Sequence, residues 1–334
     1  MKLDIRTNDS VFTELASCWN TLLQHSHNNL IFLTLEWQRT WWEAYHPGEL
    51  HVVVGKTDDG DVVAIAPWFI QHRDNQSVIR TIGCVDVTDY LDIIVKPEYA
   101  ESFLNALADH VSSPHMRDVA LQLCNIPARS LLLEQLPPLL EARGFATQVS
   151  LQEVCPVIHL PETWDDYLSL LNKKQRHELR RKMRRVSEQA DWYIVDSRHD
   201  LQAETDTFLR LMAASTPEKS AFLADPLNAT FFRLIIPRLY VAGWLKLCFL
   251  TINGEPAAAY FNLDYNNRIL VYNSGQDVAQ YGNYSAGIVL LAYCIRHAIE
   301  SGREVFDFLR GDETYKYQLG GQDTQVFLLR AQRA

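Results

Sequence analysis

The chain lacks the features that would place it outside the ordinary globular class. No apolar run approaches the roughly 20 residues that a membrane helix needs. The first residues, MKLDIRTNDS, have no apolar core of an export signal. The sequence therefore predicts a cytoplasmic protein with no membrane span.

Cysteine is scarce and dispersed, and the histidines are scattered. The six cysteines contain no Cys-x-x-Cys pair: they are Cys18, Cys84, Cys124, Cys155, Cys248 and Cys294. We expect all of them to be reduced residues of the core. His25 and His27 have neither the spacing nor the neighbouring ligands of a zinc site, so no metal is predicted.

Length and charge limit the remaining possibilities. The chain has 334 residues, of which 47% are hydrophobic and 22% charged, with a formal net charge of -10. This length is more than one core usually fills, so two domains are expected. The negative charge argues against DNA and against any nucleic acid spread over the whole surface, although a local basic patch is compatible with it.

One pattern of strands and helices occurs twice. The runs 50–70 and 244–263 are hairpins around Asp-Gly and Asn-Gly. Each hairpin is followed by a strand, a helix and another strand, at 89–95, 99–113 and 117–123 and again at 268–275, 285–302 and 303–309. The fold class predicted is α/β (α+β), with two tandem modules at 1–155 and 156–334, each a mixed sheet flanked by helices.

The segment 154–195, between the halves, is strongly basic. Apolar residues at helical spacing predict a helix that starts after Pro161. The rest of its surface carries eight basic residues: Lys173, Lys174, Arg176, Arg180, Arg181, Lys182, Arg184 and Arg185. This face is either solvated or binds an anionic ligand. In the second case we expect Arg176, Arg180 and Arg181 to contact the substrate.

The second-half helix begins directly after a strand, at Ser285, a natural N-cap. The free N–H groups and the dipole of such a helix suit pyrophosphate. The alternative is an ordinary capped helix with a packing glycine.

Three strings in fixed order carry a family resemblance: WDDYLSLLNKKQRHELRRKMRR, VYNSGQDVAQYGNYSAGIVLL and FDFLRGDETYKYQLG. They resemble the tandem-domain GNAT acyltransferases, in the branch named for cellulose-biosynthesis-associated and biotin-synthesis-like acetyltransferases, which is related in fold to the Fem aminoacyl transferases. In the N-terminal half, FLTLEWQRTWWEAY and DVTDYLDIIV also look like that branch. The resemblance covers nearly the whole chain.

The resemblance implies two GNAT modules, with acetyl-CoA or another acyl-CoA bound by the second. It places the cofactor pyrophosphate at the backbone amides of Ser285, Ala286 and Gly287. Gln280 and Gly282 match part of the usual GNAT loop at a different spacing.

The corner FDFLRGDETYKYQLGG holds the candidate chemistry. Asp307, Asp312 and Tyr315 are the candidate catalytic residues, with Asp307 as base and Tyr315 as proton donor to the leaving thiolate. Arg310 is a candidate cofactor ligand and Lys316 a candidate substrate ligand. The alternatives are an Asp307 bonded to a neighbouring loop or paired with an arginine, and a charged surface turn with an Asp312–Lys316 pair.

Asp89, Tyr90 and Asp92 hold the matching position in the first half and are candidate acceptor ligands, although Asp89 also suits a simple turn. Trp37, Trp41 and Trp42 are expected in the core.

These features favour an acyl-CoA-dependent N-acyltransferase acting on a small-molecule or sugar-like amine. Two alternatives stay open. One is a Fem-like transferase using aminoacyl-tRNA, for which the acidic remainder of the surface is unfavourable. The other is a non-catalytic GNAT-fold module that binds an anionic partner through the basic helix.

Overall fold

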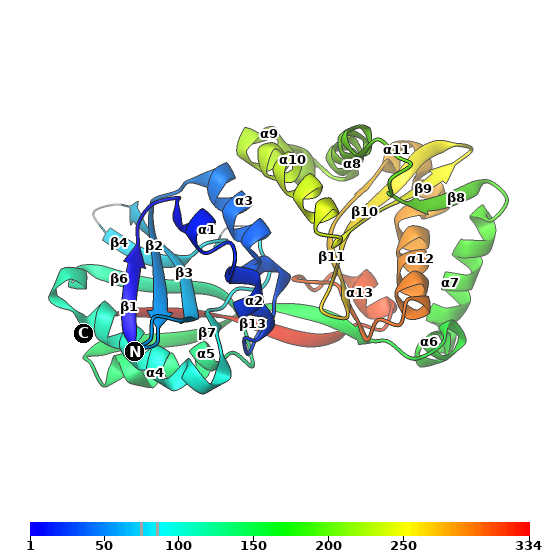
Figure 1. Ribbon diagram of the computed structural model, residues 1–334. Helices are drawn as coiled ribbons and strands as arrows, with labels where there is room; N and C mark the ends of the chain where they lie inside the picture. The colour runs from blue at the N-terminus through cyan, green and yellow to red at the C-terminus, as the bar shows by residue number, and fades with distance from the viewer. Residues whose placement is uncertain (74–75, 85–86) are drawn as a thin grey trace. The chain divides into compact units, whose positions relative to one another are not determined.

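The computed structural model describes residues 1–73, 76–84 and 87–334 (Figure 1). The chain forms two compact units, of which unit 1 is Met1–Val154 with Thr324–Ala334 and unit 2 is Cys155–Asp323. The C-terminal residues 324–334, which the sequence analysis placed in the second module, therefore belong to unit 1. Asp86, in one of the strings that resemble the family, lies outside the described residues.

Unit 1 is built on a mixed sheet in the order β1-β2-β3-β4-β6-β13-β7, with β5 beside β3. The strands are β1 (Lys2–Arg6), β2 (Glu49–Lys56), β3 (Val62–Arg73), β4 (Gln76–Thr81), β5 (Ile94–Val95), β6 (Val119–Pro127), β7 (Phe145–His159) and β13 (Gln322–Arg333). The predicted first hairpin is confirmed, because β2 and β3 pair antiparallel. Gly60 lies in the turn at φ 94°, which favours glycine.

Helices pack on both faces of β2 and β3 in unit 1. They are α1 (Val11–Glu14), α2 (Trp19–Gln24), η1 (Ile31–Leu33), α3 (Leu35–Tyr45), η2 (Pro97–Tyr99), α4 (Ala100–Ser112), η3 (Pro114–Met116) and α5 (Leu131–Glu141). α4 and α5 share one hydrophobic core with the sheet. On α3, Trp41 and Trp42 pack against Phe69 of β3 with tilted rings. Trp37, Trp41 and Trp42 are buried, so their predicted place in the core is confirmed.

The predicted repeat exists, but its third strand in the first half is β4 and not 89–95. β4 pairs in parallel with β6 after the chain has passed through α4. Of the residues 89–95, only β5 is a strand, and it pairs with β3. Leu91 and Ile93 are buried. Their apolar alternation reflects packing of an irregular segment onto the core, which looks like a strand in sequence.

Unit 2 repeats this arrangement in the order β7-β12-β11-β10-β9-β8. Its further strands are β8 (Ala190–Ile194), β9 (Leu245–Ile252), β10 (Glu255–Tyr265), β11 (Arg268–Gln276) and β12 (Val305–Asp307). The second predicted hairpin, β9–β10, is confirmed, with Asn253 and Gly254 both at positive φ. β11 and β12 are parallel and joined through α12 (Ala286–Glu300). β12 is shorter than the predicted 303–309, and Leu309 lies at φ 58°.

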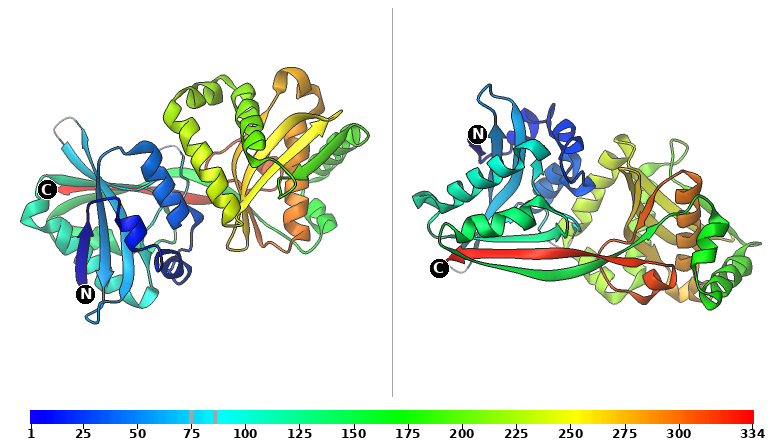
Figure 2. Two further views of the ribbon diagram at one scale, coloured as in Figure 1. Left: turned by 45° about the horizontal axis from the view of Figure 1, so that its top comes forward. Right: turned by 90° about the horizontal axis from the view of Figure 1, so that it is seen from below.

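The strand antiparallel to the fourth strand of each repeat comes from a distant part of the chain. In unit 1, β13 pairs with β6, and in unit 2, β7 pairs with β12. Figure 2 shows β13, in red, running beside β7, in green. This pairing explains why the C-terminal residues join unit 1.

The predicted basic helix is two helices in the structure. The helices of unit 2 are α6 (Trp164–Leu170), α7 (Lys173–Val186), α8 (Leu201–Ser215), α9 (Pro217–Ala224), α10 (Pro226–Val241), α11 (Val278–Tyr281), η4 (Gly282–Tyr284), α12 and α13 (Thr314–Gln318). A capping box formed by Asn172 and Gln175 starts α7 after a break at Leu171. Leu171, at the break, and Leu179, on α7, are both buried. The predicted apolar face is therefore confirmed at these two positions, although the helix is interrupted.

The expectation that all six cysteines are reduced is wrong for two of them. Cys84 and Cys124 form a disulfide in unit 1, with their Cα atoms 6.0 Å apart. The other four, Cys18, Cys155, Cys248 and Cys294, are free thiols. Cysteines 40 residues apart in sequence meet here through the tertiary fold, which their spacing does not indicate.

Two absences hold for the residues that the structure describes. No helix in them is long and apolar enough to cross a membrane. They also contain no group of three or more His, Cys, Asp or Glu side chains that could hold a metal ion.

Candidate functional site

The candidate site lies in unit 2, where β11 extends beyond β12. The two strands pair only over Arg268–Leu270 and Val305–Asp307. β11 continues to Gln276, and within the described part of unit 2 no strand pairs with that extension on the β12 side. α12 packs on β10 and β11 (Figure 1). The expectation that it begins directly after a strand is wrong, because α11 and η4 lie between the end of β11 at Gln276 and its start at Ala286. Backbone N–H groups and side chains therefore converge where the two parallel strands separate.

The helix start at Ala286 is confirmed, but Ser285 does not cap it with its side chain. Ser285 lies in the left-handed region, at φ 55° and ψ 40°, and its hydroxyl makes no capping hydrogen bond. A non-glycine residue in this region costs energy and marks a functional constraint more often than chance. The first N–H groups of α12 have no intrahelical acceptor, which is the arrangement that binds anions at the starts of other helices.

Gly287 is tightly surrounded. A Cβ atom at this position would lie 2.7 Å from Oε1 of Gln276, the last residue of β11. Glycine therefore lets the end of β11 approach the first turn of α12. Any larger residue would push the Gln276 side chain away.

The C-terminal part of α7 packs against α12 and η4. Arg185 donates a hydrogen bond of 2.8 Å from Nη1 to the carbonyl oxygen of Asn283. Its guanidinium is thereby held two residues before Ser285. The sequence analysis counted Arg185 only as one member of the basic run, because nothing in the sequence links α7 to the start of α12.

The three arginines predicted to bind substrate have local partners. Arg181 forms two hydrogen bonds with the carboxylate of Glu178, at 2.6 and 2.8 Å. Arg176 donates to the Leu168 carbonyl at 3.3 Å. Arg180 is more than half exposed and lies 4.0 Å from Asp165. Their role in substrate binding stays a prediction.

The turn that follows β12 is held by a side-chain hydrogen bond. Asp307 is buried, and its Oδ1 accepts a hydrogen bond of 2.8 Å from the Leu309 N–H. This bond fixes the left-handed Leu309. The structure therefore shows Asp307 bonded to the neighbouring loop, and its role as a base stays a prediction.

Lys316 is buried, and its ammonium lies inside this turn. It donates to the carbonyls of Leu309, Arg310 and Gly311, at 3.3, 2.6 and 3.1 Å. It also forms an ion pair of 2.9 Å with Glu313. Lys316 thus holds the corner, a position that leaves its ammonium little capacity for substrate. The alternative surface pair with Asp312 is also wrong, since the partner is Glu313 and Asp312 is exposed.

Tyr315 and Tyr260, the latter on β10, belong to the same hydrophobic cluster of unit 2. Burial, with the nearby Glu313 carboxylate, raises the pKa of Tyr315, and burial raises that of Tyr260 well above its ordinary value. Tyr315 packs edge-on against Phe308. A phenol with a raised pKa stays protonated, which suits a proton donor and not a base.

Lys219 of α9 is a residue that the sequence analysis missed. Its ammonium donates to the carbonyl oxygen of Ser274 at 2.5 Å and to the Ser274 hydroxyl at 3.1 Å. Burial lowers its pKa from 10.5 to about 8, against the opposing effect of Glu313. Ser274 is opposite Tyr260 in the β10–β11 register. No local motif around Lys219 announces this position, which depends on the path of α9.

The candidate acceptor residues of the first half lie in unit 1. Asp92 accepts hydrogen bonds from Asn28, Ser130 and its neighbour Ile93, and burial raises its pKa. Ser130 also caps α5. Asp92 therefore links two segments of unit 1. Tyr90 is buried with its ring 6.0 Å from that of Phe32, whereas Asp89 is partly exposed.

Comparison with known families identifies the domain that carries this site. Residues 173–317 match the family model described as the acetyltransferase (GNAT) domain. The match covers less than half of the chain, and this segment is similar to a GNAT domain. It contains α7, Lys219, the start of α12 and the corner up to Tyr317, so the matched segment holds the whole candidate site. No curated protein matches the chain.

Solved structures show the fold of the rest. FemX has a TM-score of 0.66 at 12% identity, covering 98% of this chain and 97% of that one. A conserved Bacteroides thetaiotaomicron protein of unknown function has a TM-score of 0.63 at 12% identity, covering 98% and 100%. L-PGS from Bacillus licheniformis has a TM-score of 0.58 at 9% identity, covering 95% and 91%. At these identities the likeness shows the fold alone. The predicted relation to the GNAT and Fem folds is confirmed.

Proposed function

We propose that the chain is an acyl-CoA-dependent N-acyltransferase that transfers an acyl group, in the first place acetyl, to the amine of a small-molecule or sugar-like acceptor. The observation that carries the proposal is the uncapped start of α12 within the segment that is similar to a GNAT domain. There Ser285 is left-handed and the guanidinium of Arg185 is held on Asn283.

These residues fit the pyrophosphate of CoA. The N–H groups of Ala286 and Gly287 would donate to phosphate oxygens, and the left-handed Ser285 keeps its own side chain out of their way. Arg185 would add a charge-assisted contact. Gly287 keeps the first turn close to the end of β11, where the acyl thioester would continue between the separated strands.

The corner would supply the proton transfers. The neutral amine attacks the thioester carbonyl, a C–N bond forms, and the C–S bond then breaks. In our proposal the exposed Asp312 accepts the proton from the nitrogen, and Tyr315 gives a proton to the departing thiolate. Asp307 and Lys316 act as positioning residues that hold the turn. Arg310 is kept as a proposed cofactor ligand.

Titration calorimetry with CoA and acetyl-CoA tests the donor. We expect binding in the micromolar range, and no binding at millimolar ligand would overturn the acyl-CoA proposal in favour of the non-catalytic alternative. Tyr315→Phe tests the chemistry, because it should lower kcat about 100-fold, within the range for one general acid, while leaving CoA affinity unchanged.

A second candidate is a Fem-like transferase that takes its acyl group from aminoacyl-tRNA. The exposed basic residues of α7, including Lys173, Lys174 and Arg184, favour it. Filter binding of tRNA at increasing salt tests it, since phosphate contacts give a steep salt dependence. Flat and negligible binding would remove this candidate.

The proposed location is the cytoplasm. The Cys84–Cys124 disulfide is an unusual bond for that compartment. A thiol count on protein isolated from cells without exposure to oxidant therefore tests the location together with the bond.

A further inference from the structure

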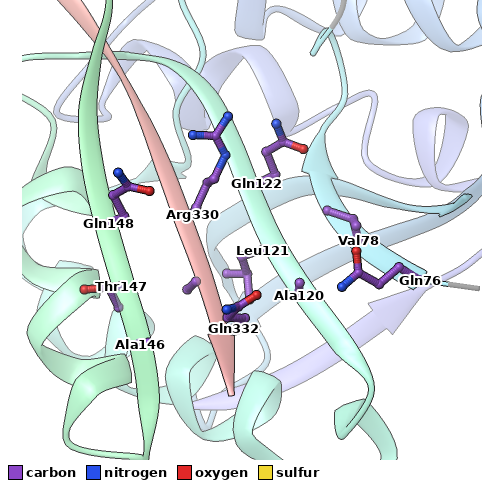
Figure 3. Close-up of a pocket in the computed structure, with 11 residues that line it drawn as sticks. Gln76, Val78, Ala120, Leu121, Gln122, Ala146, Thr147, Gln148, Arg330 and Gln332 are labelled. Atoms are coloured by element: carbon purple, nitrogen blue, oxygen red, sulfur yellow. The ribbon is translucent and has the colours of Figure 1, made fainter. Parts of the chain in front are cut away.

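A cavity of about 470 Å³ opens on the sheet of unit 1 (Figure 3). Its walls come from β4, β6, β13 and β7. In the registers of these strands, Arg330 is opposite Gln122, and Val78 is opposite Ala120. Leu123 and Leu329, on the other side of the pleat, belong to the core under α4 and α5. The cavity therefore lies on the face of these strands opposite α4 and α5.

The lining has an unusual composition for a water-exposed sheet face. Small aliphatic residues, Val78, Ala120 and Ala146, form part of it. Its polar side chains are those of Gln76, Gln122, Gln148, Arg330 and Gln332. Thr147 also borders the cavity, but its hydroxyl donates to the Glu141 carboxylate of α5. The lining contains no carboxylate, so the charge of Arg330 has no opposite charge among these residues. The lining is thus positively charged, whereas the chain as a whole has a net charge of -10.

The side-chain amide of Gln122 is oriented by an arginine on the neighbouring strand. Arg80 of β4 donates from Nη2 to Oε1 of Gln122, at 2.7 Å. With its oxygen engaged, Gln122 presents its NH₂ group to a ligand as a donor. Figure 3 shows the Gln122 and Arg330 side chains on adjacent strands, with Gln148 on the next. A cation and one oriented amide thus share one concave surface.

We propose that this cavity binds a small monocarboxylate that also carries amide groups, such as an N-acylated amino acid or a short peptide. Its carboxylate pairs with the Arg330 guanidinium, and its amides exchange hydrogen bonds with Gln122 and Gln148. A planar guanidinium matches a carboxylate in two parallel hydrogen bonds. The cavity has the volume that small-molecule sites usually have. The inference does not depend on the acyltransfer proposed for unit 2.

The probe is N-acetylglycylglycine, compared with its C-terminal amide and with gluconate, a carboxylate that has hydroxyls in place of amides. Binding to the full-length protein is followed by NMR chemical shifts or calorimetry. We expect the peptide acid to bind at least tenfold more tightly than its amide and than gluconate. The proposal is overturned if the peptide acid does not bind at a concentration of about 10 mM, on the order of the weakest specific affinities. It is also overturned if the acid and the amide bind with equal affinity. Equal affinity for gluconate overturns the role of the amides.

Two variants locate the site. Arg330→Gln should weaken peptide-acid binding at least tenfold, whereas Arg117→Gln, an exposed arginine of unit 1 that does not line the cavity, should leave it unchanged. Ala120→Leu fills the cavity without changing charge and should also abolish binding. Circular dichroism verifies that each variant is folded. Unchanged affinity in folded Arg330→Gln or Ala120→Leu overturns the proposal.

Discussion

Arg185 Nη1 donates a 2.8 Å hydrogen bond to the carbonyl oxygen of Asn283, which lies just before the left-handed Ser285. The bond joins the basic helix α7 to the segment that starts α12. One residue of the basic run is thereby positioned beside the proposed pyrophosphate site. The anion-site argument for the run is strongest at Arg185, although the prediction for Arg176, Arg180 and Arg181 remains open.

Replacing Arg185 should weaken CoA binding. Arg185→Ala removes a charge-assisted contact of roughly 1.5 to 3 kcal/mol, so the Kd for CoA should rise about 10- to 100-fold. Arg184→Ala is the matched control, because Arg184 is an exposed neighbour on the same helix. Calorimetry measures both. If the two variants bind CoA equally well, Arg185 is not a ligand.

Gly287→Ala should reduce CoA affinity more than it reduces stability. The added methyl group would meet Oε1 of Gln276 at 2.7 Å, so the Gln276 side chain would have to turn away, and the methyl group would stand beside the N–H groups proposed to bind pyrophosphate. Alanine is otherwise the better helix former, which offsets part of the cost. The variant is compared with the parent by CoA titration and by thermal unfolding. If CoA affinity and thermal stability fall together by comparable free energies, Gly287 has a packing role alone.

Lys219 should react as an amine of low basicity. Its pKa is lowered by burial from 10.5 to about 8. Competitive labelling with acetic anhydride between pH 6 and 11, read by mass spectrometry, should show half-maximal ionisation near that value, with exposed Lys174 as comparator in the same sample. The folded state binds fewer protons than the unfolded state in the window from about 8 to 10.5, so this group makes stability rise with pH there. In Lys219→Met that rise should be lost. If the labelling of Lys219 has the same pH dependence as that of Lys174, the prediction is contradicted.

The histidine pair of unit 1 should make the fold sensitive to acid. Nε2 of His51 on β2 lies 2.8 Å from Nε2 of His110 on α4, so one ring must donate and the other accept. Burial, with the effect of His110, lowers the pKa of His51 from 6.5 to about 4, and burial lowers that of His110. A lowered histidine pKa gives stability that is complete above 6.5 and lost as pH falls toward 4.

For His51 alone the loss is about 3 kcal/mol over that window. Urea unfolding at pH 7 and at pH 4.5 measures it. His51→Gln, which cannot ionise, should flatten the dependence, while the exposed His25→Gln should not. A parent protein whose unfolding free energy is the same at both pH values would exclude the effect.

The disulfide predicts a thiol count. Denatured without reductant, the protein should react with iodoacetamide at four cysteines and leave Cys84 and Cys124 unmodified. A bond that closes a 40-residue separation contributes roughly 2 to 4 kcal/mol, so dithiothreitol should lower the melting temperature. Labelling of all six cysteines would show that the bond is absent in solution.

Local sequence determined much of the backbone. Asp59-Gly60 and Asn253-Gly254 gave both hairpins, because few residues adopt the positive φ that such turns need. The sequence also placed the start of α12 near Ala286, although Ser285, expected as its cap, makes no capping hydrogen bond. The order of strands and helices and the motifs of the second half likewise led to the GNAT fold.

Tertiary structure decided the partners. No pattern near Lys219 shows that α9 carries it to Ser274, and none near Arg185 shows that it meets Asn283. Lys316 looks like a surface residue of a charged turn until three carbonyls surround it. β13 joins β6 across about 200 residues of chain, and Cys84 meets Cys124 in the same way. Periodicity and turn chemistry act over a few residues, whereas these contacts depend on where the packed chain brings distant segments together.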